Sequence, residues 1–264
     1  MSRRSAVQGV APSVSVVIPV RDDAAALDRC LRLLALQTMT PSEVVVVDNA
    51  SSDDSAAVAA AHGAHVVTEH RVGIPSAAAA GYDRATGEIV VRCDADTRPG
   101  PRWLSQLVGP LVRDPRLDAV SGLGSFYDLP HGLRTAAAVA YLGAYYGLTH
   151  LALGHTALWG SNMAFRRQTW LDIRADVHRH ADVHDDMDLA FVVGPTRRIR
   201  LVRVAVGVSA RSLSGRAQRR RRMQRARTTL RLNWTVLPPW LRWRDRYHPR
   251  AAQIRSWVTR NPVR

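Results

Sequence analysis

The sequence predicts an α/β fold of the Rossmann type, in which helices cover both faces of a mostly parallel sheet. Three observations support this prediction. Short β-branched runs recur along residues 14–94, a helical pattern separates each run from the next, and the runs are apolar throughout instead of alternating with polar residues. Continuous apolar strands are typical of parallel sheets that are buried on both sides, and strands that alternate with helices build such sheets.

The first strand is expected at 14–20 (VSVVIPV). The first helix is expected at 22–39, where apolar residues recur at helical spacing behind an aspartate that can cap the helix. A second buried strand follows at 43–50 (EVVVVDNA). The Ser and Asp residues at 51–54 then offer a start for an Ala-rich helix, which ends at Gly63.

A third strand (HVVTE, 65–69) precedes a helix expected over 75–86, which has Pro75 near its start and Gly87 at its end. The run EIVVRCD (88–94) supplies the fourth strand. In an open parallel sheet the ligand site lies at the carboxyl ends of the strands. We therefore expect the functional residues directly after these strands.

Composition indicates one folded domain, or one domain with an appendage, because 264 residues with 46% hydrophobic content can bury a substantial core. The two cysteines, Cys30 and Cys93, lie in an apolar helical pattern and at a strand end. They give little support to a disulfide framework or a zinc cluster, and they favour a reducing cytoplasm. The apolar run at 14–20 is short and interrupted by Pro19, so it predicts a first strand and not a signal peptide.

Charge divides the chain into a mildly acidic body and a basic extension. Residues 1–196 carry 17 Arg and 21 acidic residues, a formal charge of −4, whereas residues 197–264 carry 20 Arg and one acidic residue, a charge of +19. Every basic residue is Arg, which also fits a GC-rich genome, so the Arg count alone identifies no partner. We expect a flexible N-terminus (1–12), one domain at 13–210 and a basic helical extension, rich in Arg and Trp, at 211–264.

Three carboxylates are expected at one edge of the sheet. Asp48 closes the second strand, and Asp94 and Asp96 close the fourth. Carboxylates gathered there repel one another unless a cation lies between them, and hard oxygen ligands suit Mg²⁺ or Mn²⁺ that bridges to a diphosphate. A lone D-x-D tripeptide is often an ordinary polar turn, but its place after a buried strand favours a metal-bound nucleotide.

Five motifs, in this order, resemble those of family 2 glycosyltransferases of the GT-A fold. They are VSVVIPVRDD, VVVVDNASSDDS, ATGEIVVRCDADTRPGPRWL, WGSNMAFRR (159–167) and HDDMDLAF (184–191). The similarity spans about residues 14–210. It implies a GT-A-like domain with a nucleotide-binding half at 13–125 and an acceptor half at 126–210.

The resemblance implies an inverting, hexosyltransferase-type enzyme that moves a sugar from a nucleotide diphosphate sugar to a hydroxyl group of a glycan or lipid-linked acceptor, with Mg²⁺ or Mn²⁺ as the cofactor. It assigns Pro19 and Asp22 to the loop under the nucleoside and Asp48 to the base or ribose. It also places Asp94 beside the ribose or the metal and makes Asp96 a metal ligand. The sequence leaves the nucleotide, the sugar, the acceptor and the oligomeric state open.

The resemblance makes Asp186 the base that takes the proton from the acceptor hydroxyl. Asp185 stands where the family usually has Glu, so the base assignment stays open between the two. Acidic residues at this position would also suit a helix N-terminus. The acceptor-side loop is carried by Trp159, Gly160, Ser161 and Asn162, for which a tight turn with an apolar anchor is the structural alternative.

The third helix departs from the family pattern, because Ala78 and Ala79 stand where a basic group often lies near the diphosphate. Charge compensation must then come from elsewhere. Arg71, Arg211 and Arg216 are candidates, since the planar guanidinium suits diphosphate oxygens. Solvated surface arginines are an equally good interpretation.

Residues 135–159 are uncharged and long enough to suggest a membrane span. A single crossing there would put Asp96 and Asp186 on opposite sides of the membrane, so we expect buried or interfacial helices instead. Tyr141, Tyr145 and Tyr146 could then lie at a headgroup boundary.

The extension combines Arg with Trp, as in GRAQRRRRMQRARTTLRLNWTVLPPWLRWRD, which favours an anionic membrane surface. We therefore expect a peripheral protein on the cytoplasmic face of the membrane that makes cell-envelope polysaccharide. Nucleic-acid binding and a solvated helix are the alternatives for this segment. A nucleotidyltransferase is an alternative for the whole chain, but its Gly-rich, basic N-terminal loop is missing.

Overall fold

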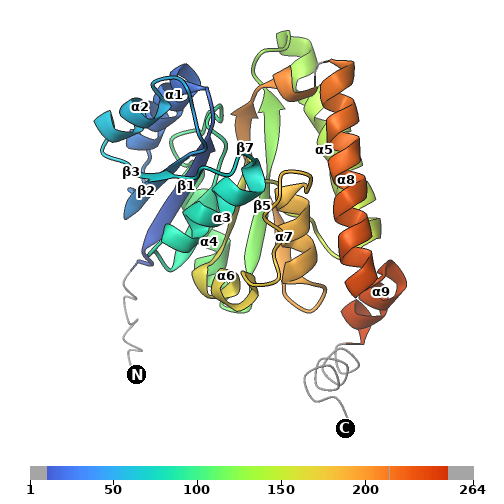
Figure 1. Cartoon of the computed structure of the whole chain (residues 1–264). Helices are drawn as coiled ribbons and strands as arrows, with labels where there is room; N and C mark the ends of the chain where they lie inside the picture. The colour runs from blue at the N-terminus through green and yellow to red at the C-terminus, as the bar shows by residue number, and fades with distance from the viewer. Residues whose placement is uncertain (1–10, 214, 249–264) are drawn as a thin grey trace, which may run out of the picture.

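The computed structural model describes residues 11–213 and 215–248, and its centre is a seven-stranded sheet (Figure 1). The strand order is β3-β2-β1-β4-β6-β5-β7. The strands are β1 Val14–Val20, β2 Glu43–Asp48, β3 His65–Thr68, β4 Ile89–Arg92, β5 Ala119–Phe126, β6 Met163–Arg166 and β7 Ile199–Val208. The four strands predicted from the sequence are present, and they pair in parallel as expected.

The sheet is mixed because β6 runs antiparallel to both of its neighbours, β4 and β5. Strand β5 in turn pairs in parallel with β7. The register of β1 with its partners brings Val20 beside Asp48 and Val17 beside Arg92. The carboxyl ends of β1, β2 and β4 therefore meet at one edge, which is the edge where the sequence places the carboxylates.

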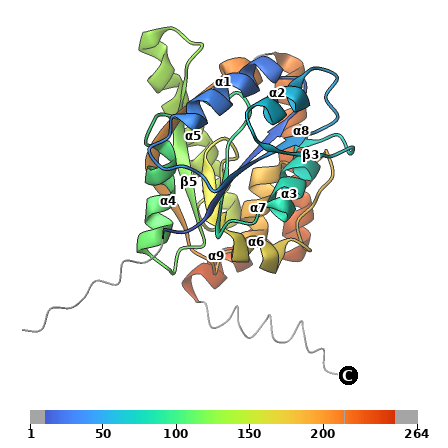
Figure 2. The ribbon, with the colours of Figure 1, turned by 90° about the vertical axis from the view of Figure 1, so that its left-hand side faces the viewer.

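Helices cover both faces of the sheet, as predicted (Figures 1 and 2). On one face lie α1 (Ala24–Ala35), α2 (Ser55–Ala61) and α4 (Trp103–Arg113), and on the other lie α3 (Ile74–Arg84), α6 (Arg167–Ile173) and α7 (Asp185–Val193). Successive side chains of β1 point to opposite faces, so Val16 and Ile18 join one core while Val17 joins the other. Burial on both faces explains why the strand is apolar throughout.

The first helix is shorter than predicted, because residues before Ala24 form a turn. Asp22 adopts a left-handed backbone conformation (φ 51°), which an α-helix does not allow. Its carboxylate accepts hydrogen bonds from the backbone N–H (2.7 Å) and the hydroxyl (2.9 Å) of Ser52. The loops after β1 and β2 are thereby tied together.

The basic segment, as far as it is described, forms α8 (Arg216–Val236) and α9 (Pro239–Tyr247), after the short 3₁₀ turn η1 (Ala210–Leu213). Helix α8 is anchored to the α7 region by two polar contacts. The Thr229 hydroxyl accepts from the backbone N–H of His184 (2.8 Å), and the Asn233 amide donates to Asp188 (2.7 Å). The predicted extension over 249–264 lies outside the described residues.

Helix α5 (His131–Leu153) packs along β5 and lies beside α8 (Figure 1). Among the described helices, α5 alone is long and apolar enough to cross a membrane by length and composition, a test that core helices of soluble proteins also pass. Only 22% of its most apolar window is buried in the protein. Tyr145 and Tyr146 fix α5 to the core by donating hydrogen bonds to the carbonyls of Leu158 (2.6 Å) and Gly122 (2.7 Å).

Candidate functional site

Two cavities meet at the carboxyl edge of the sheet. The larger has a volume of about 360 Å³ and lies among β4, α5, α7 and α8, and the smaller, of about 270 Å³, lies over the ends of β1 and β2. We call them the inner cavity and the strand-end cavity. Asp94 and Asp96 line both. The D-x-D tripeptide therefore stands at the junction of two binding spaces.

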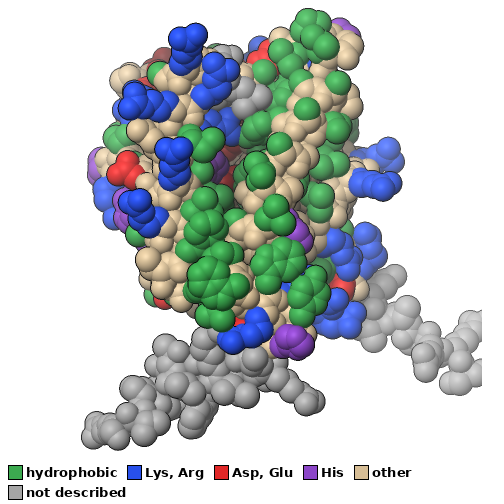
Figure 3. Space-filling view, turned by 90° about the vertical axis from the view of Figure 1, so that its right-hand side faces the viewer, with side chains coloured by type: hydrophobic (Ala, Val, Ile, Leu, Met, Phe, Trp, Pro, Cys, Tyr) green, Lys and Arg blue, Asp and Glu red, His purple; other side chains and the backbone are tan. Residues whose placement is uncertain are grey.

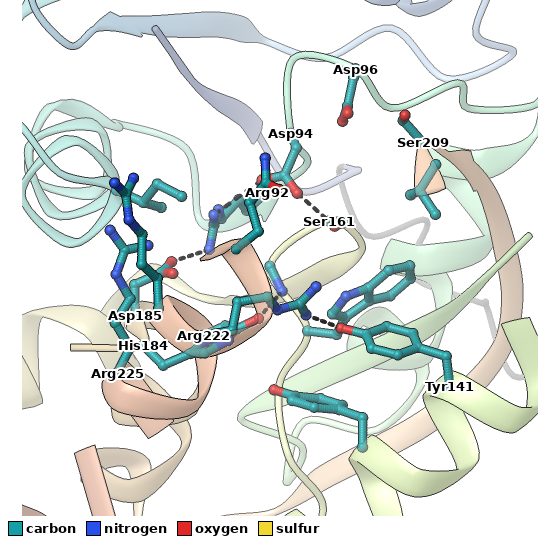
Figure 4. Close-up of a pocket in the computed structure, with 18 of the residues that line it drawn as sticks. Arg92, Asp94, Asp96, Tyr141, Ser161, His184, Asp185, Ser209, Arg222 and Arg225 are labelled. Atoms are coloured by element: carbon teal, nitrogen blue, oxygen red, sulfur yellow. Dashed lines mark hydrogen bonds and ion pairs between the residues drawn. The ribbon is translucent and has the colours of Figure 1, made fainter. Parts of the chain in front are cut away.

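A tight turn holds the two aspartates at this junction. After β4 ends at Arg92, the backbone N–H of Asp94 donates to the Thr97 hydroxyl (3.1 Å) and the N–H of Thr97 donates to the Asp94 carbonyl (3.0 Å). One Asp94 oxygen accepts from the Ser161 hydroxyl (2.5 Å). The other lies 3.1 Å from a nitrogen of Arg92. Figure 4 shows the contacts of Asp94 with Ser161 and Arg92.

Asp96 shares its cation with a second carboxylate. Its partner among the described residues is Arg211, at 3.1 Å, and Arg211 also pairs with Asp23. Burial and the nearby Asp94 carboxylate raise the pKa of Asp96 to about 6, although Arg211 opposes the shift. Two carboxylates with oxygen donors at a junction of cavities fit the ligand preference of Mg²⁺ or Mn²⁺.

His184, Asp185 and Asp186 form a second group whose ligand atoms lie within 4.8 Å of one another. Their charges are already paired. Asp185 forms an ion pair with Arg92, and an oxygen of Asp186 lies 2.7 Å from Nδ1 of His184. This group therefore has less need of a cation than Asp96 has.

Asp186 has the environment of an ionised carboxylate. Its second oxygen accepts from the backbone N–H of Gly160 (2.8 Å). Burial alone would raise the pKa of Asp186, but His184, Arg92 and the Gly160 N–H stabilise the carboxylate and lower the pKa to about 2. In turn, burial opposes charge on His184, yet Asp186 raises the pKa of the imidazole above its ordinary value.

The interpretation of these aspartates as helix caps is only partly met. His184 is the N-cap of α7 and makes no side-chain capping hydrogen bond, while Asp185 and Asp186 line the inner cavity. Asp188 has the structural role: it is fully buried and accepts from the N–H of His178 (2.9 Å) and from Asn233.

The segment predicted to lie on the acceptor side has residues in the inner cavity and a residue in the protein core. Trp159, Gly160 and Ser161 line the inner cavity. Asn162 is fully buried and lines neither cavity: it accepts from the Trp103 indole (2.9 Å) and donates to two backbone carbonyls. An acceptor contact of Asn162 is therefore not available in this structure, and the residue holds the loop in place.

The residues predicted to contact the nucleotide also fall into two groups, those that line a cavity and those that bind the chain itself. Pro19 lines the strand-end cavity, whereas the carboxylates of Asp22 and Asp48 are turned to the chain itself. Asp48 accepts from the backbone N–H of Ser51 (3.2 Å) and lines neither cavity, and its contact with the base or ribose stays a prediction. Its neighbour Asn49, which the sequence analysis did not single out, lines the strand-end cavity instead.

Of the three arginines proposed near the diphosphate, only Arg211 lines a cavity. Arg71 pairs with Glu69 and, like Arg216, lines neither cavity. Arg92, which was not predicted from the sequence, is only 2% exposed and joins Asp94 to Asp185. A charged residue that ends the apolar run IVVR was the signal that could have identified it.

Replacing Arg92 should destabilise the protein more than replacing a surface arginine. Arg92→Met leaves Asp185 buried without its cation, which typically costs about 3 kcal/mol or more of unfolding free energy. Urea unfolding measures this difference. Arg29→Met, on the exposed surface of α1, is the control and should change the free energy by less than about 0.5 kcal/mol. Equal unfolding free energies for the two variants would show that the Arg92 ion pairs contribute nothing.

Comparison with known proteins identifies relatives of one kind. The model of the family described as "Glycosyl transferase family 2" matches residues 15–170. The undecaprenyl-phosphate 4-deoxy-4-formamido-L-arabinose transferase of Sodalis glossinidius is 37% identical over 111 residues, which are 38% of this chain and 34% of that protein. An uncharacterised glycosyltransferase of Mycobacterium tuberculosis is 40% identical over 110 residues, 42% of this chain and 48% of that protein. The matches span less than half of these relatives.

Solved structures with the same fold include glucosyl-3-phosphoglycerate synthase of Mycobacterium tuberculosis, crystallised with Mn²⁺, UDP and glucosyl-3-phosphoglycerate. The TM-score is 0.62 at 20% sequence identity, and the likeness covers 84% of this chain and 80% of that one. The complex with Mn²⁺, UDP-glucose and phosphoglyceric acid gives a TM-score of 0.61, also at 20% identity. At this identity the likeness establishes the fold, which is GT-A-like as predicted.

Proposed function

Because the chain belongs to glycosyl transferase family 2, we propose that it transfers a sugar from a nucleotide diphosphate sugar to a hydroxyl group of an acceptor. One observation carries this proposal: Asp94 and Asp96 stand where the strand-end cavity meets the inner cavity. A donor whose nucleotide occupies the strand-end cavity and whose sugar enters the inner cavity would place its diphosphate beside these carboxylates. We also propose the division into a nucleotide half (13–125) and an acceptor half (126–210); the strand-end cavity is lined from the first half and by Arg211, and the inner cavity from both halves and α8.

The proposed donor site uses Pro19 and Asn49 against the nucleoside and Arg211 against the diphosphate, as all three line the strand-end cavity. Asp96, assisted by Asp94, would hold Mg²⁺ or Mn²⁺. A divalent cation there supplies neutralisation of the charge that develops on the leaving diphosphate. Arg211 would then exchange its partner Asp96 for a phosphate oxygen.

We propose inversion at the anomeric carbon, by a single displacement. The acceptor hydroxyl forms the new bond to that carbon as the bond to the diphosphate breaks, and Asp186 takes the hydroxyl proton. Asp185 and Asp94 both pair with Arg92, a permanent cation, whereas Asp186 pairs with His184, whose imidazole can lose its proton, so we propose Asp186 for this task. A double displacement would need a second, unpaired carboxylate beside the sugar.

A panel of UDP-, GDP- and dTDP-sugars with Mn²⁺ tests the proposed function. One donor should be hydrolysed slowly without acceptor, and chelation should stop the reaction. Proton NMR of the transferred sugar then reads the anomeric configuration, which should be opposite to that of the donor. No binding or hydrolysis of any donor would overturn the proposal, and a retained configuration would overturn the single displacement.

We also propose that the protein acts as a peripheral enzyme on the cytoplasmic face of a membrane, on a glycan or lipid-linked acceptor. Figure 3 views the side of the molecule formed by α5, α8 and α9, and shows hydrophobic side chains along this face with Arg at its margins. The exposed large hydrophobic side chains of α5 and α9 are Leu133, Val139, Leu148, Leu151, Trp240 and Tyr247. An apolar strip flanked by cations suits the interface of an acidic bilayer.

Charge placed on this strip should weaken membrane binding. Leu148 and Leu151 are 69% and 63% exposed, so Leu148→Glu/Leu151→Glu should leave the fold intact and reduce cosedimentation with anionic vesicles at least tenfold. The matched control, Leu36→Glu/Val112→Glu, changes two exposed apolar residues of α1's C-terminus and α4, and it should bind normally. Added salt should weaken binding by the unmodified chain. Equal binding by both double variants, or tighter binding to DNA than to acidic lipid, would contradict the membrane proposal.

A further inference from the structure

One face of α8 projects arginines into the inner cavity. Its lining residues are Gln218, Arg221, Arg222 and Arg225, at positions i, i+3, i+4 and i+7, which lie on one side of a helix. Farther along the same side, Thr229 and Asn233 fix α8 to the α7 region. The anchoring contacts and the arginines therefore belong to one helical face. We call Arg221, Arg222 and Arg225 the arginine wall.

The carboxylates that line the inner cavity pair with residues other than Arg221 and Arg225. Asp94 and Asp185 pair with Arg92, Asp186 pairs with His184, and Asp96 pairs with Arg211. Arg222 contacts the hydroxyl and the ring of Tyr141. No carboxylate of the described residues forms an ion pair with Arg221 or Arg225.

The arrangement also has an electrostatic cost in the free protein. Arg221 and Arg225 are four residues apart on one helix, where like charges repel. They line a second, outer hollow together with Gln224 and Thr228, so the wall extends from the inner cavity toward the surface. Asp182 lines that hollow as well but pairs with neither arginine. Figure 4 shows Arg222 and Arg225 toward the α8 side of the inner cavity, with Asp96 and Ser209 toward the other.

We infer that the arginine wall binds a phosphate group carried by the acceptor. Guanidinium groups bind phosphate oxygens through paired hydrogen bonds, and an anion between Arg221 and Arg225 would relieve their repulsion. The wall lines the cavity that holds Asp186 and not the strand-end cavity of the nucleotide, so its ligand is distinct from the donor diphosphate. This inference rests on the proposed function, because it names the acceptor's recognition group.

The first test uses the full chain with inorganic phosphate as the probe, measured by calorimetry in protein saturated with Mn²⁺ and the nucleoside diphosphate (UDP, GDP or dTDP) of the donor that the panel identifies. Wild type should bind phosphate. Arg221→Gln/Arg225→Gln should weaken phosphate binding at least tenfold and leave the affinity for that nucleotide unchanged. The control, Arg220→Gln/Arg227→Gln, removes the same charge from exposed positions of α8 that line neither cavity, and should change phosphate affinity less than twofold.

Each contrary outcome has a separate meaning. Equal losses in both double variants would show a general effect of surface charge and overturn the inference. Displacement of phosphate by the nucleotide would assign the wall to the donor site, which also overturns it. Failure of wild type to bind any of UDP, GDP and dTDP with Mn²⁺ contradicts the proposed function instead, and phosphate binding is then compared in nucleotide-free protein. If Arg221→Gln/Arg225→Gln does not fold, Arg221→Lys/Arg225→Lys, which retains the charge, is measured in its place.

The second test separates soluble from lipid acceptors. Transfer is measured to glycerol 3-phosphate against glycerol, and to a polyprenyl phosphate against the polyprenol in neutral vesicles. In one of these pairs the phosphate-bearing compound should have a KM at least tenfold lower, and Arg221→Gln/Arg225→Gln should abolish that advantage. Equal KM values with and without phosphate in both pairs would overturn the inference.

Discussion

Asp96→Asn is expected to abolish transfer and metal-dependent nucleotide binding, with a loss of turnover on the order of 10³-fold or more. Asn keeps the size of the side chain but removes the negative charge that a hard divalent cation prefers. Asp94 alone would be a weak replacement, because its two oxygens already contact Arg92 and Ser161. Calorimetry of UDP with and without Mn²⁺ and a transfer assay measure the two losses.

The same variant should be at least as stable as the metal-free wild type at pH 7. The folded-state pKa of Asp96 is raised to about 6 from 3.8 by burial and Asp94, so the folded protein binds the proton more tightly than the unfolded chain does. Ionised Asp96 therefore destabilises the metal-free protein above about pH 6, and this penalty fades as the pH falls toward 4. Removing the charge should raise the unfolding free energy by about 1 kcal/mol, after part of the gain is offset by the loss for Arg211.

An inactive but stable variant separates a ligand role from a structural role. Asp176→Asn, at an exposed position outside both cavities, is the matched control and should alter neither activity nor stability. Full turnover by Asp96→Asn would remove the D-x-D tripeptide from the metal site. A large loss of stability would instead make Asp96 a structural residue, with Arg211 as its partner.

The sequence predicted the part of the site that depends on strand ends. Runs of apolar residues locate β1, β2 and β4, and a parallel sheet brings their carboxyl ends together, so the position of Asp94 and Asp96 follows without coordinates. The assignment of Asp48 to the base or ribose stays a prediction. Its side chain turns back to the N–H of Ser51, and Asn49, the first residue beyond β2, is the one that faces the strand-end cavity.

What could not be predicted depends on packing between distant segments. Arg92 stands out only once α7 brings Asp185 against it, 93 positions along the chain. The arginine wall faces the inner cavity because Thr229 and Asn233 anchor α8 to the α7 region. The basic sequence of α8 does not by itself indicate which of its arginines face the cavity. Strand β6 has only four residues, within a segment that was expected to form a loop, so its antiparallel pairing has no strong local signal.

Asp186→Asn is expected to lower the rate of transfer by a factor on the order of 10² or more, while donor binding is retained. The amide cannot take the hydroxyl proton at neutral pH, and Asp186 lines the inner cavity away from the strand-end cavity. Its carbonyl oxygen can still accept from the Gly160 N–H, which holds the loop beside the cavity. Single-turnover transfer, together with calorimetry of the donor nucleotide, measures the rate and the binding separately.

The pH dependence of the transfer rate distinguishes Asp186 from the other carboxylates. His184 and the Gly160 N–H overcome the effect of burial and hold the pKa of Asp186 at about 2, below the ordinary 3.8, so this base stays ionised until the pH falls toward 2. Any decline in rate between pH 5 and 7 must then arise elsewhere, and it should persist in the residual activity of Asp186→Asn.

The variant Asp185→Asn distinguishes Asp186 from its neighbour. Asp185 has the opposite environment: burial raises its pKa while Arg92 opposes the rise, and its charge is engaged by that arginine. Asp185→Asn leaves the buried Arg92 with Asp94 as its remaining carboxylate among the described residues, so this variant should lose stability more than it loses rate constant in the folded enzyme. If Asp185→Asn is the inactive variant and Asp186→Asn transfers sugar at the normal rate, Asp185 is the base and Asp186 serves to position His184 and Gly160.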